Sequence, residues 1–300
     1  MKESFWEELR KITEHCFAEE KMSGHTTFHA GGPAEYYVRP KRMQVAKILS
    51  LCRTYAIPWL VIGNGSNLLV GDKGIKGLVI ELGREMSQIT TEGNSIKAEA
   101  GAMLSSVARV AAEQGLTGME FASGIPGTIG GAVVMNAGAY GGEMKRIVNK
   151  ATVLTPEGEE KELNLQELQL GYRHSCIPEN DYIVLDTELV LEPGDSEKIQ
   201  EQMAKLRTQR CKKQPLEYPS AGSTFKRPEG YFAGKLIQDA GLKGFRVGDA
   251  QISEKHSGFV INRGNATASE IAELIRQVQN RVERHSGVKL ETEVRFLGEF

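Results

Sequence analysis

A glycine-rich run, 124–142, is the stretch of this 300-residue sequence that most restricts how the chain can fold. It contains seven glycines among small neighbours, and Pro126 stiffens it. Glycine accounts for 33 of the 300 residues, above the usual share of about 7%, but the 10 prolines and the lack of a G-x-y period exclude collagen and low-complexity disorder. Such an excess indicates backbone that turns sharply or lies close to a ligand. Internal packing explains some of these glycines, but it does not readily explain why so many occur in one run.

A second glycine loop, Gly63-Asn64-Gly65-Ser66-Asn67, follows a short apolar stretch at 58–62. It begins like the dinucleotide fingerprint G-x-G-x-x-G, but the third glycine position holds Leu68, and further glycines interrupt the place where a crossover helix should follow. A Rossmann fold is therefore disfavoured. Successive backbone N–H groups, with Ser66 and Asn67 as side-chain donors, favour a compact nest around a pyrophosphate; a tight surface turn is the alternative.

The overall composition excludes several classes of protein. Lys and Arg total 37 against 39 for Asp and Glu, so the net charge of −2 and the pI near 6.4 predict neither nucleic-acid nor membrane-surface binding. The four cysteines are far apart in the sequence, which disfavours a disulfide framework or a structural zinc site, and we expect no metal. The acidic N-terminus is unlike a signal peptide and no long apolar segment occurs, so we expect a cytoplasmic protein.

Hydrophobic periodicity predicts a mixed chain of helices and strands. The pattern predicts alternating strands and helices in the first seventy residues and an α+β arrangement from Gly77 onward. Pro193-Gly194 is the strongest signal of a domain boundary. The predicted domains are 1–75, 76–195 and 196–300. The main predicted helices are 5–16, 43–55, 104–114, 197–211, 231–240 and 267–286, and the main strands are 36–39, 58–62, 78–80, 95–99, 148–154, 182–191, 258–262 and 288–297.

Three motifs together carry a resemblance to a known family: Ile62-Gly-Asn-Gly-Ser-Asn-Leu-Leu69, Gly124-Ile-Pro-Gly-Thr-Ile-Gly-Gly131 and Asn136-Ala-Gly-Ala-Tyr140. The chain resembles the bacterial UDP-N-acetylenolpyruvoylglucosamine reductases (the MurB family), and later motifs agree in the right order. The resemblance implies an α+β chain with a two-subdomain FAD-binding fold of the PCMH/VAO type, followed by a smaller α+β substrate-binding domain. It implies non-covalent FAD, and NADPH as hydride donor. The implied cofactor-binding residues are Gly63, Asn64, Gly65, Ser66, Asn67, Leu68, Gly124, Pro126, Gly127, Thr128, Gly130, Gly131, Asn136, Gly138 and Ala139.

The resemblance also implies a reaction and three catalytic residues, Arg173, Ser223 and Glu293. The enolpyruvyl group of UDP-N-acetylglucosamine enolpyruvate would be reduced to UDP-N-acetylmuramate, a peptidoglycan precursor. Arginine stays protonated and can hold a carboxylate with two parallel N–H bonds, so Arg173 suits the substrate carboxylate. Ser223 would donate the proton and Glu293 would assist it, although strand alternation places Glu291 on the same face as Glu293. Taken alone, the three could be a solvated arginine, a turn-capping serine and a surface glutamate.

The substrate-binding residues implied by the same resemblance are Tyr172, Lys213, Lys226 and Arg227. Lys213 lies in a basic cluster that would otherwise be a solvated helix face. Arg227 departs from the family pattern, which often has an asparagine there, and the short segment after Tyr172 resembles the type without a tyrosine-bearing insertion. The implied partner is the UDP-sugar, and we expect a monomer.

Two other functions are compatible with parts of this pattern. An FAD-dependent oxidase of the same superfamily could pass electrons to oxygen and attach its flavin through His29, beside Gly31-Gly32. A nucleotide-binding module without catalytic activity would use only the glycine loops. Neither alternative explains why Arg173, Ser223 and Glu293 occur in their motifs.

Overall fold

The computed structural model describes residues 2–300 and divides into two compact units with separate hydrophobic cores. Unit 1 comprises Met1–Phe17, Tyr36–Asn64 and Gly77–Gln209, and unit 2 comprises Ala18–Glu35, Gly65–Lys76 and Arg210–Phe300. The chain therefore passes several times from one unit to the other. The three domains predicted from sequence are continuous segments, whereas residues 1–75 contribute to both units, and the predicted boundaries stay predictions.

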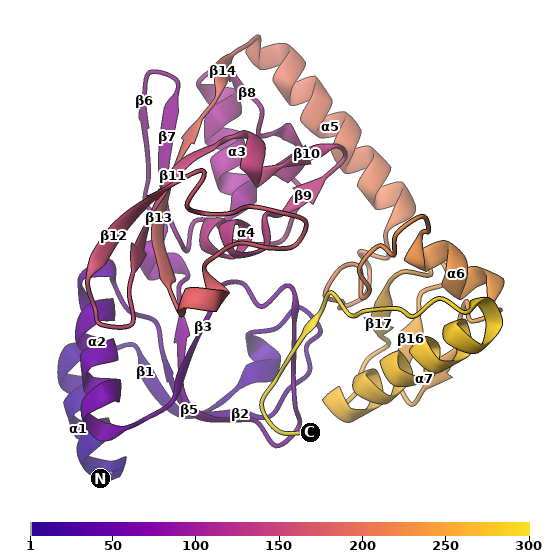
Figure 1. The fold of residues 1–300 in the computed structure, drawn as a ribbon, viewed down its shortest axis with the longest axis horizontal. Helices are drawn as coiled ribbons and strands as arrows, with labels where there is room; N and C mark the ends of the chain where they lie inside the picture. The colour runs from indigo at the N-terminus through magenta and orange to yellow at the C-terminus, as the bar shows by residue number, and fades with distance from the viewer. Residues whose placement is uncertain (1) are drawn as a thin grey trace. The chain divides into compact units, whose positions relative to one another are not determined.

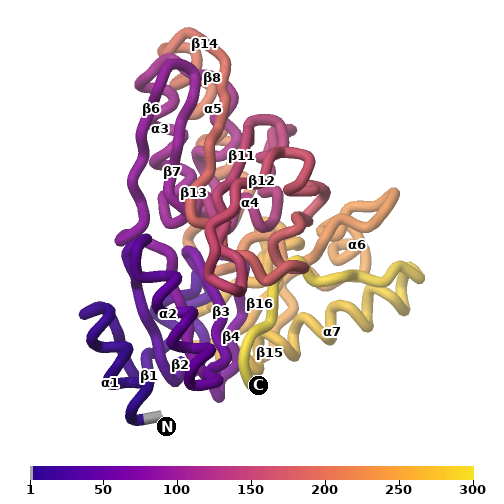
Figure 2. The backbone as a smooth tube through the Cα atoms, turned by 60° about the vertical axis from the view of Figure 1, so that its left-hand side comes forward, coloured from indigo at the N-terminus to yellow at the C-terminus, as the bar shows by residue number. Residues whose placement is uncertain are grey.

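Unit 1 begins with two neighbouring helices, α1 (Lys2–Ile12) and α2 (Arg42–Tyr55), which lie side by side in both ribbon and tube views (Figures 1 and 2). Phe5 of α1 packs edge-on against Tyr36 and Tyr55, so the aromatic side of α1 is buried. A four-stranded sheet, of which β1, β2 and β5 each contain residues of both units, has the order β1-β2-β5-β3, and β3 runs parallel to β5. Its strands are β1 (Cys16–Lys21), β2 (Pro33–Val38), β3 (Trp59–Ile62) and β5 (Ile75–Glu81).

The larger part of unit 1 is a five-stranded antiparallel sheet of order β12-β11-β13-β7-β6. The helices α3 (Leu104–Glu113) and α4 (Ile129–Met135) pack on β7, and α4 also packs on β13 (Figure 1). Two short pairs, β8 (Leu116–Thr117) with β14 (Glu192–Pro193) and β9 (Gly138–Ala139) with β10 (Gly142–Glu143), lie outside this sheet. The five strands of the sheet are β6 (Ile89–Glu92), β7 (Ser95–Glu99), β11 (Val148–Leu154), β12 (Glu160–Asn164) and β13 (Ile183–Val190).

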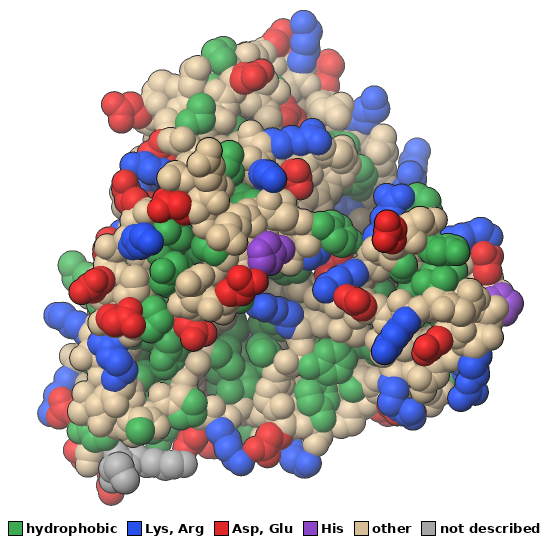
Figure 3. Space-filling model, viewed as in Figure 1, with side chains coloured by type: hydrophobic (Ala, Val, Ile, Leu, Met, Phe, Trp, Pro, Cys, Tyr) green, Lys and Arg blue, Asp and Glu red, His purple; other side chains and the backbone are tan. Residues whose placement is uncertain are grey.

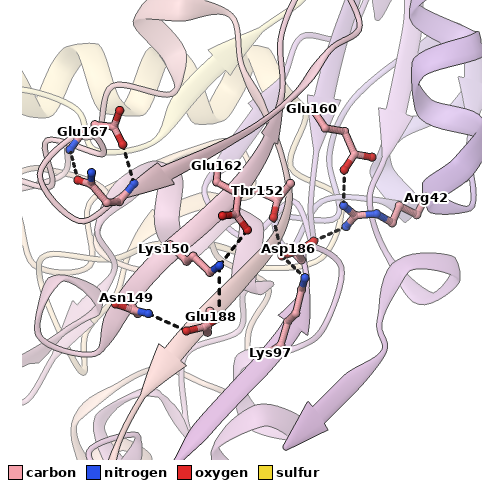
Figure 4. Close-up of polar contacts among 11 residues, drawn as sticks. Arg42, Lys97, Asn149, Lys150, Thr152, Glu160, Glu162, Glu167, Asp186 and Glu188 are labelled. Atoms are coloured by element: carbon pink, nitrogen blue, oxygen red, sulfur yellow. Dashed lines mark hydrogen bonds and ion pairs between the residues drawn. The ribbon is translucent and has the colours of Figure 1, made fainter. Parts of the chain in front are cut away.

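A buried carboxylate connects α2 to this sheet (Figure 4). Asp186 of β13 has a side chain only 3% exposed, and it accepts hydrogen bonds from Arg42 of α2 and, at 2.9 Å, from Thr152 of β11. The ammonium of Lys97 lies 3.3 Å from it, and Arg42 also binds Glu160 at 2.8 Å. A cation in the first turn of a helix interacts unfavourably with the helix dipole, and the ion pair with Asp186 offsets this cost for Arg42.

Unit 2 has a three-stranded antiparallel sheet, β15 (Arg246–Val247), β16 (Ala250–Ile252) and β17 (Val260–Asn262), against which α7 (Ala268–Ser286) packs. Thr267 and Glu270 form the predicted capping box of α7, and Asp72 accepts hydrogen bonds from Ala268 N and Ser269 N at 2.8 Å. The short helix α6 (Ala233–Asp239) packs on α7. Elsewhere in unit 2, β4 (Leu68–Val70) pairs in parallel with β18 (Arg295–Leu297).

The long helix α5 (Ser196–Lys213) continues from unit 1 into unit 2. Five single turns of 3-10 helix complete the secondary structure: Met22–Gly24, Arg84–Met86, Glu120–Ala122, Met144–Arg146 and Pro178–Asn180. On the face drawn in Figure 3, acidic and basic side chains are interspersed, in keeping with the small net charge. Among the described residues, no helix combines the length and the apolar character needed to span a membrane.

Several predicted elements are confirmed and others differ in extent. The strands 95–99 and 148–154 match β7 and β11, and the helix 267–286 matches α7 with Thr267 as its cap. The first helix ends at Ile12 rather than at 16, and α6 is shorter than 231–240. The strand expected over 288–297 is regular only at 295–297, because Thr292 makes just an isolated bridge to Phe225.

Candidate functional site

The two glycine loops meet within unit 1. The Asn64 side chain donates a hydrogen bond from Nδ2 to the Pro126 carbonyl at 2.8 Å. A Cβ placed on Gly63 would lie 2.4 Å from Thr128 Oγ1, so only glycine allows the loops to approach this closely. The loop that follows β3 therefore lies directly against the start of α4.

Backbone donors at these loops differ in how far the protein itself uses them. At the start of α4, Ile129 N donates to Ala102 O and Gly130 N to Ala100 O, each at 2.8 Å. Among the described residues, no backbone carbonyl accepts from the N–H groups of Gly63, Asn64 or Ser66. Unpaired donors clustered in one short loop fit the pyrophosphate of FAD, because anions bind where backbone N–H groups converge.

Other residues implied to bind the cofactor also have structural contacts. Gly130 packs against Ala100, where an added Cβ would lie 2.9 Å from the Ala100 Cβ. Gly138 and Ala139 form β9, and Gly131 N donates to Thr128 Oγ1 at 3.4 Å. Gly127 O accepts from Leu104 N, whereas no main-chain group in residues 2–300 bonds Gly124 in this way, and Gly124 is half-buried. Packing therefore explains part of the glycine content of this run, and ligand approach is needed only for the rest.

In unit 2, Gly65 has a φ of +61°, and an added Cβ would lie 1.9 Å from the His25 carbonyl oxygen. The next residues join the C-terminal segment: Asn67 donates from Nδ2 to Glu293 O at 2.9 Å, and Leu68 pairs with Arg295. One end of the predicted cofactor loop is thus fixed to the segment that carries a predicted catalytic glutamate.

Arg173 occupies a tight turn of unit 1. Gly171 N donates to His174 O at 3.1 Å, His174 N donates to Gly171 O at 3.3 Å, and Arg173 itself has a φ of +54°. The Arg173 guanidinium carbon lies 5.2 Å from the centre of the Tyr172 ring, which is largely exposed. Positive φ is costly for a side chain of this size, and such strain is commonly found at functional sites.

The segments that carry Ser223 and Glu293 are joined in unit 2 through Thr224, the residue after the serine. Thr224 accepts from Glu293 N at 2.8 Å, donates its own N–H to Gly258 O at 2.9 Å, and its hydroxyl accepts from Val260 N. Thr224 is fully buried, whereas Ser223 is exposed, so alternation turns the serine hydroxyl to the surface. Thr224 was not among the predicted site residues, and the available signal was its place as a small polar residue beside the candidate proton donor.

The structure distinguishes the two glutamates that strand alternation leaves equivalent. Glu291 is exposed and forms an ion pair with Lys226, at 3.2 Å. Glu293 is half-buried and its backbone is held by Thr224 and Asn67. Fixed position and partial burial suit a group that assists a proton transfer.

The remaining predicted substrate residues lie in unit 2. Arg227 stacks over Phe232, with its guanidinium carbon 4.0 Å from the ring centre, and donates from Nε to Tyr231 O at 3.3 Å. Lys213 ends α5, and its charge contributes, after burial, to lowering the pKa of His256. His256, which was not among the predicted residues, accepts at Nδ1 from Gly258 N at 3.1 Å.

Comparison with known proteins agrees with both halves of the chain. Residues 34–164 match the profile of the FAD binding domain, and residues 214–297 match that of the UDP-N-acetylenolpyruvoylglucosamine reductase C-terminal domain. The chain is 56% identical over 294 residues to the UDP-N-acetylenolpyruvoylglucosamine reductase of Agathobacter rectalis, with 94% of each chain covered. It is 52% identical over 278 residues to that of Clostridium perfringens, with 92% of this chain and 91% of the relative covered.

Solved structures give the same answer for the fold. The crystal structure of the reductase from Thermus caldophilus has a TM-score of 0.81 and 38% identity, and the match covers 92% of this chain and 97% of that one. A glucose dehydrogenase, Phl p 4.0202, has a TM-score of 0.50 at 14% identity and shares only the fold, over 64% of this chain and 44% of that one. The predicted FAD-binding fold followed by a second α+β domain is confirmed.

Proposed function

Because this chain belongs to the UDP-N-acetylenolpyruvoylglucosamine reductase family, we propose that its own Arg173, Ser223 and Glu293 perform the family's chemistry. The chain is an FAD-containing, NADPH-dependent oxidoreductase of peptidoglycan precursor synthesis. When bound, FAD takes hydride from NADPH and supplies it to C3 of the enolpyruvyl group. The roles of the individual residues follow from what that addition demands.

The substrate carboxylate needs a cation. Hydride addition to an electron-rich enol ether is unfavourable unless the adjoining carboxylate takes up the developing charge. Arg173 would hold that carboxylate by two parallel N–H bonds and stabilise the charge as it forms. Its closed turn, with two backbone hydrogen bonds between Gly171 and His174, fixes the main chain from which the guanidinium extends.

A proton must then reach C2, and we assign it to Ser223. Serine is a weak acid in water, so this role requires a carbanion-like acceptor and help from a neighbouring group. Glu293 would assist by polarising the transfer and stabilising the enol form. The observation that carries this assignment is the hydrogen bond from Glu293 N to Thr224 O, which joins the segment of Glu293 to the residue after Ser223 within unit 2.

The nucleotide part of the substrate needs cations for its diphosphate. We assign Lys213, Lys226 and Arg227 to it, with Tyr172 at the sugar end. Lys226 would exchange its exposed partner Glu291 for a phosphate oxygen at little cost, because exposed ion pairs contribute little. Arg227, in place of an asparagine, would bring a full charge that Phe232 and Tyr231 hold in place.

The oxidase alternative is not needed. Family membership accounts for the C-terminal domain at 214–297. An oxidase that uses the FAD-binding domain alone would give this domain no function. Both NADPH and nucleotide sugars are cytoplasmic metabolites, so we place the reaction there. We expect a monomer without nucleic-acid partners.

Anaerobic stopped-flow measurement of flavin absorbance tests the assignment, with NADPH added first and the enolpyruvyl substrate second. Ser223→Ala should leave reduction by NADPH intact and slow reoxidation by substrate by roughly 10²–10⁴-fold, the usual contribution of a positioned proton donor. Ser220→Ala, in the same loop, is the matched control and should change neither step. Equal losses in both half-reactions would exclude Ser223 as the donor.

Glu293→Gln should likewise slow only reoxidation, and Glu291→Gln is its control. If Glu291→Gln has the larger effect, the two glutamates have been assigned the wrong way round. Both variants retain the shape of the side chain, so they change the acid–base group with little effect on packing.

A further inference from the structure

We propose that Asn136 is a positioning residue for Arg173, and that its side chain serves the arginine turn rather than the cofactor. The resemblance implied a cofactor contact for Asn136, alongside the glycines around it. The contacts of its side chain within unit 1 lead to a different role, which rests on the proposed function of Arg173.

Asn136 ends helix α4 in a conformation that few residues adopt. Its φ of +44° and ψ of 58° are left-handed, and its N–H donates to the carbonyls of Ala132 and Val133. Asparagine tolerates this conformation better than other side chains except glycine, and it is a common residue at helix ends. The backbone therefore turns sharply here and directs the side chain away from the helix.

Asn136 is only 2% exposed, and its side-chain amide is fully occupied as a donor. One Nδ2 hydrogen goes to the Gly171 carbonyl at 3.0 Å, and the other goes to Glu143 Oε2 at 3.0 Å. Its Oδ1 accepts from Lys145 N at 2.8 Å. With both amide hydrogens bound to protein acceptors, Asn136 has none to donate to a flavin or a phosphate.

The Gly171 carbonyl is the point where Asn136 acts on the arginine turn. The same oxygen accepts from His174 N, which closes the turn around Tyr172 and Arg173. Two residues past the arginine, Ser175 Oγ donates to Val134 O at 2.8 Å. The C-terminal part of α4 thus holds the turn at both ends, through Asn136 before Arg173 and Ser175 after it.

Glu143 strengthens this arrangement. A carboxylate acceptor shortens and strengthens the hydrogen bond from Nδ2, and burial raises the cost of leaving any of these groups unpaired. The orientation of the amide is therefore fixed, and with it the position of the Gly171 carbonyl. A misplacement of about 1 Å at a reacting group can cost about 10²-fold in rate, so the position of this carbonyl matters for Arg173.

Asn136→Gly tests the proposal, because glycine keeps the left-handed backbone and removes only the side-chain bonds. FAD affinity, measured by flavin fluorescence, and flavin reduction by NADPH should stay within about twofold of wild type. Reoxidation by the enolpyruvyl substrate should fall by about 10- to 10²-fold. In Arg173→Ala the further change Asn136→Gly should add nothing, since residues acting through one group are non-additive.

Ser175→Ala provides a second variant if Asn136→Gly does not fold. It removes the other hydrogen bond that holds the turn and should give the same pattern with a smaller loss. Asn149→Ala, an exposed asparagine bonded to Glu188, is the control and should change none of the three quantities. Loss of FAD affinity in Asn136→Gly, or an additive loss in the double variant, would overturn the positioning role.

These outcomes are separable from a failure of the proposed function. If Arg173→Ala alone leaves reoxidation intact, the role of the arginine is wrong, whatever Asn136 does. If Arg173→Ala slows reoxidation but Asn136→Gly and Ser175→Ala do not, only the positioning role is wrong.

Discussion

Replacing Arg42 with methionine should unfold unit 1 more easily, because it leaves the buried Asp186 carboxylate without its main partner. Methionine retains most of the length and apolar stem of arginine, so packing changes little. Asp186 is 3% exposed and cannot regain water, whereas Arg42 is 30% exposed. The cost is therefore dominated by the uncompensated charge on Asp186.

The magnitude follows from what remains around that carboxylate. Breaking a buried pair by removing one partner costs about 3–5 kcal/mol. Lys97 stays 3.3 Å away and Thr152 still donates at 2.9 Å, so part of the charge remains compensated. We expect about 2–3 kcal/mol for Arg42→Met, below that range. Asp186→Asn should cost less than Arg42→Met, because it removes the buried charge and leaves a partly exposed arginine that still binds Glu160.

Urea unfolding of the FAD-free protein, followed by tryptophan fluorescence, measures this effect. Both tryptophans, Trp6 and Trp59, belong to unit 1, so the signal reports on the unit that contains the cluster. Glu160→Gln is the control, because it removes the exposed partner of Arg42 and should cost less than about 1 kcal/mol. An equal midpoint shift for Arg42→Met and Glu160→Gln would refute the reasoning.

Two predictions concern pH in unit 2. Burial alone would raise the pKa of Asp72, but hydrogen bonds from Ser269 and Ala268 outweigh burial and lower this pKa. The ionised Asp72 therefore stabilises the folded state above pH 3.8, and this contribution is lost as the pH falls through the pKa of Asp72 in the folded protein. By circular dichroism, Asp72→Asn should cost about 1 kcal/mol at pH 7 and less at pH 3; a constant difference would contradict this. Burial, together with the charge of Lys213, lowers the pKa of His256. The contribution of neutral His256 to the free energy of unfolding is therefore present above pH 6.5, and it is lost as the pH falls towards the pKa of His256 in the folded protein. His256→Gln should flatten the stability profile below pH 6.5, and an unchanged slope would exclude that role.

Long periodic elements could be predicted from the sequence because their signals are local. In α7 the capping box, the apolar stripe and the closing Gly287 all lie within one continuous segment, and each is found as expected. The parallel pair of β4 and β18 could not be predicted, because each strand is three residues long and shows no periodicity. Their pairing depends on tertiary contacts such as Asn67 with the main chain of Glu293.

At the candidate site, the sequence indicated which residue types occur but not which of their hydrogen-bonding groups remain available. Asn136 and Asn64 both lie in glycine motifs, yet one is buried with both amide hydrogens bound and the other is exposed. Glu291 and Glu293 differ in the same way, since only the first forms an exposed ion pair with Lys226. These distinctions depend on neighbours far away in the sequence, which a motif does not contain.

The two glycine loops differ in how many of their backbone N–H groups are available to bind a ligand. The start of α4 uses its first N–H groups on Ala100 and Ala102, so it has little left for an anion. The N–H groups of Gly63, Asn64 and Ser66 meet no backbone carbonyl among the described residues, so under the proposed function we expect the phosphates of FAD at that loop. The longer glycine run would then approach the flavin through its small residues and hold the arginine turn from the end of α4. Under this proposal its glycine content would serve both internal packing and the position of Arg173, whereas a cofactor contact of Asn136 stays a prediction for the Asn136→Gly variant to test.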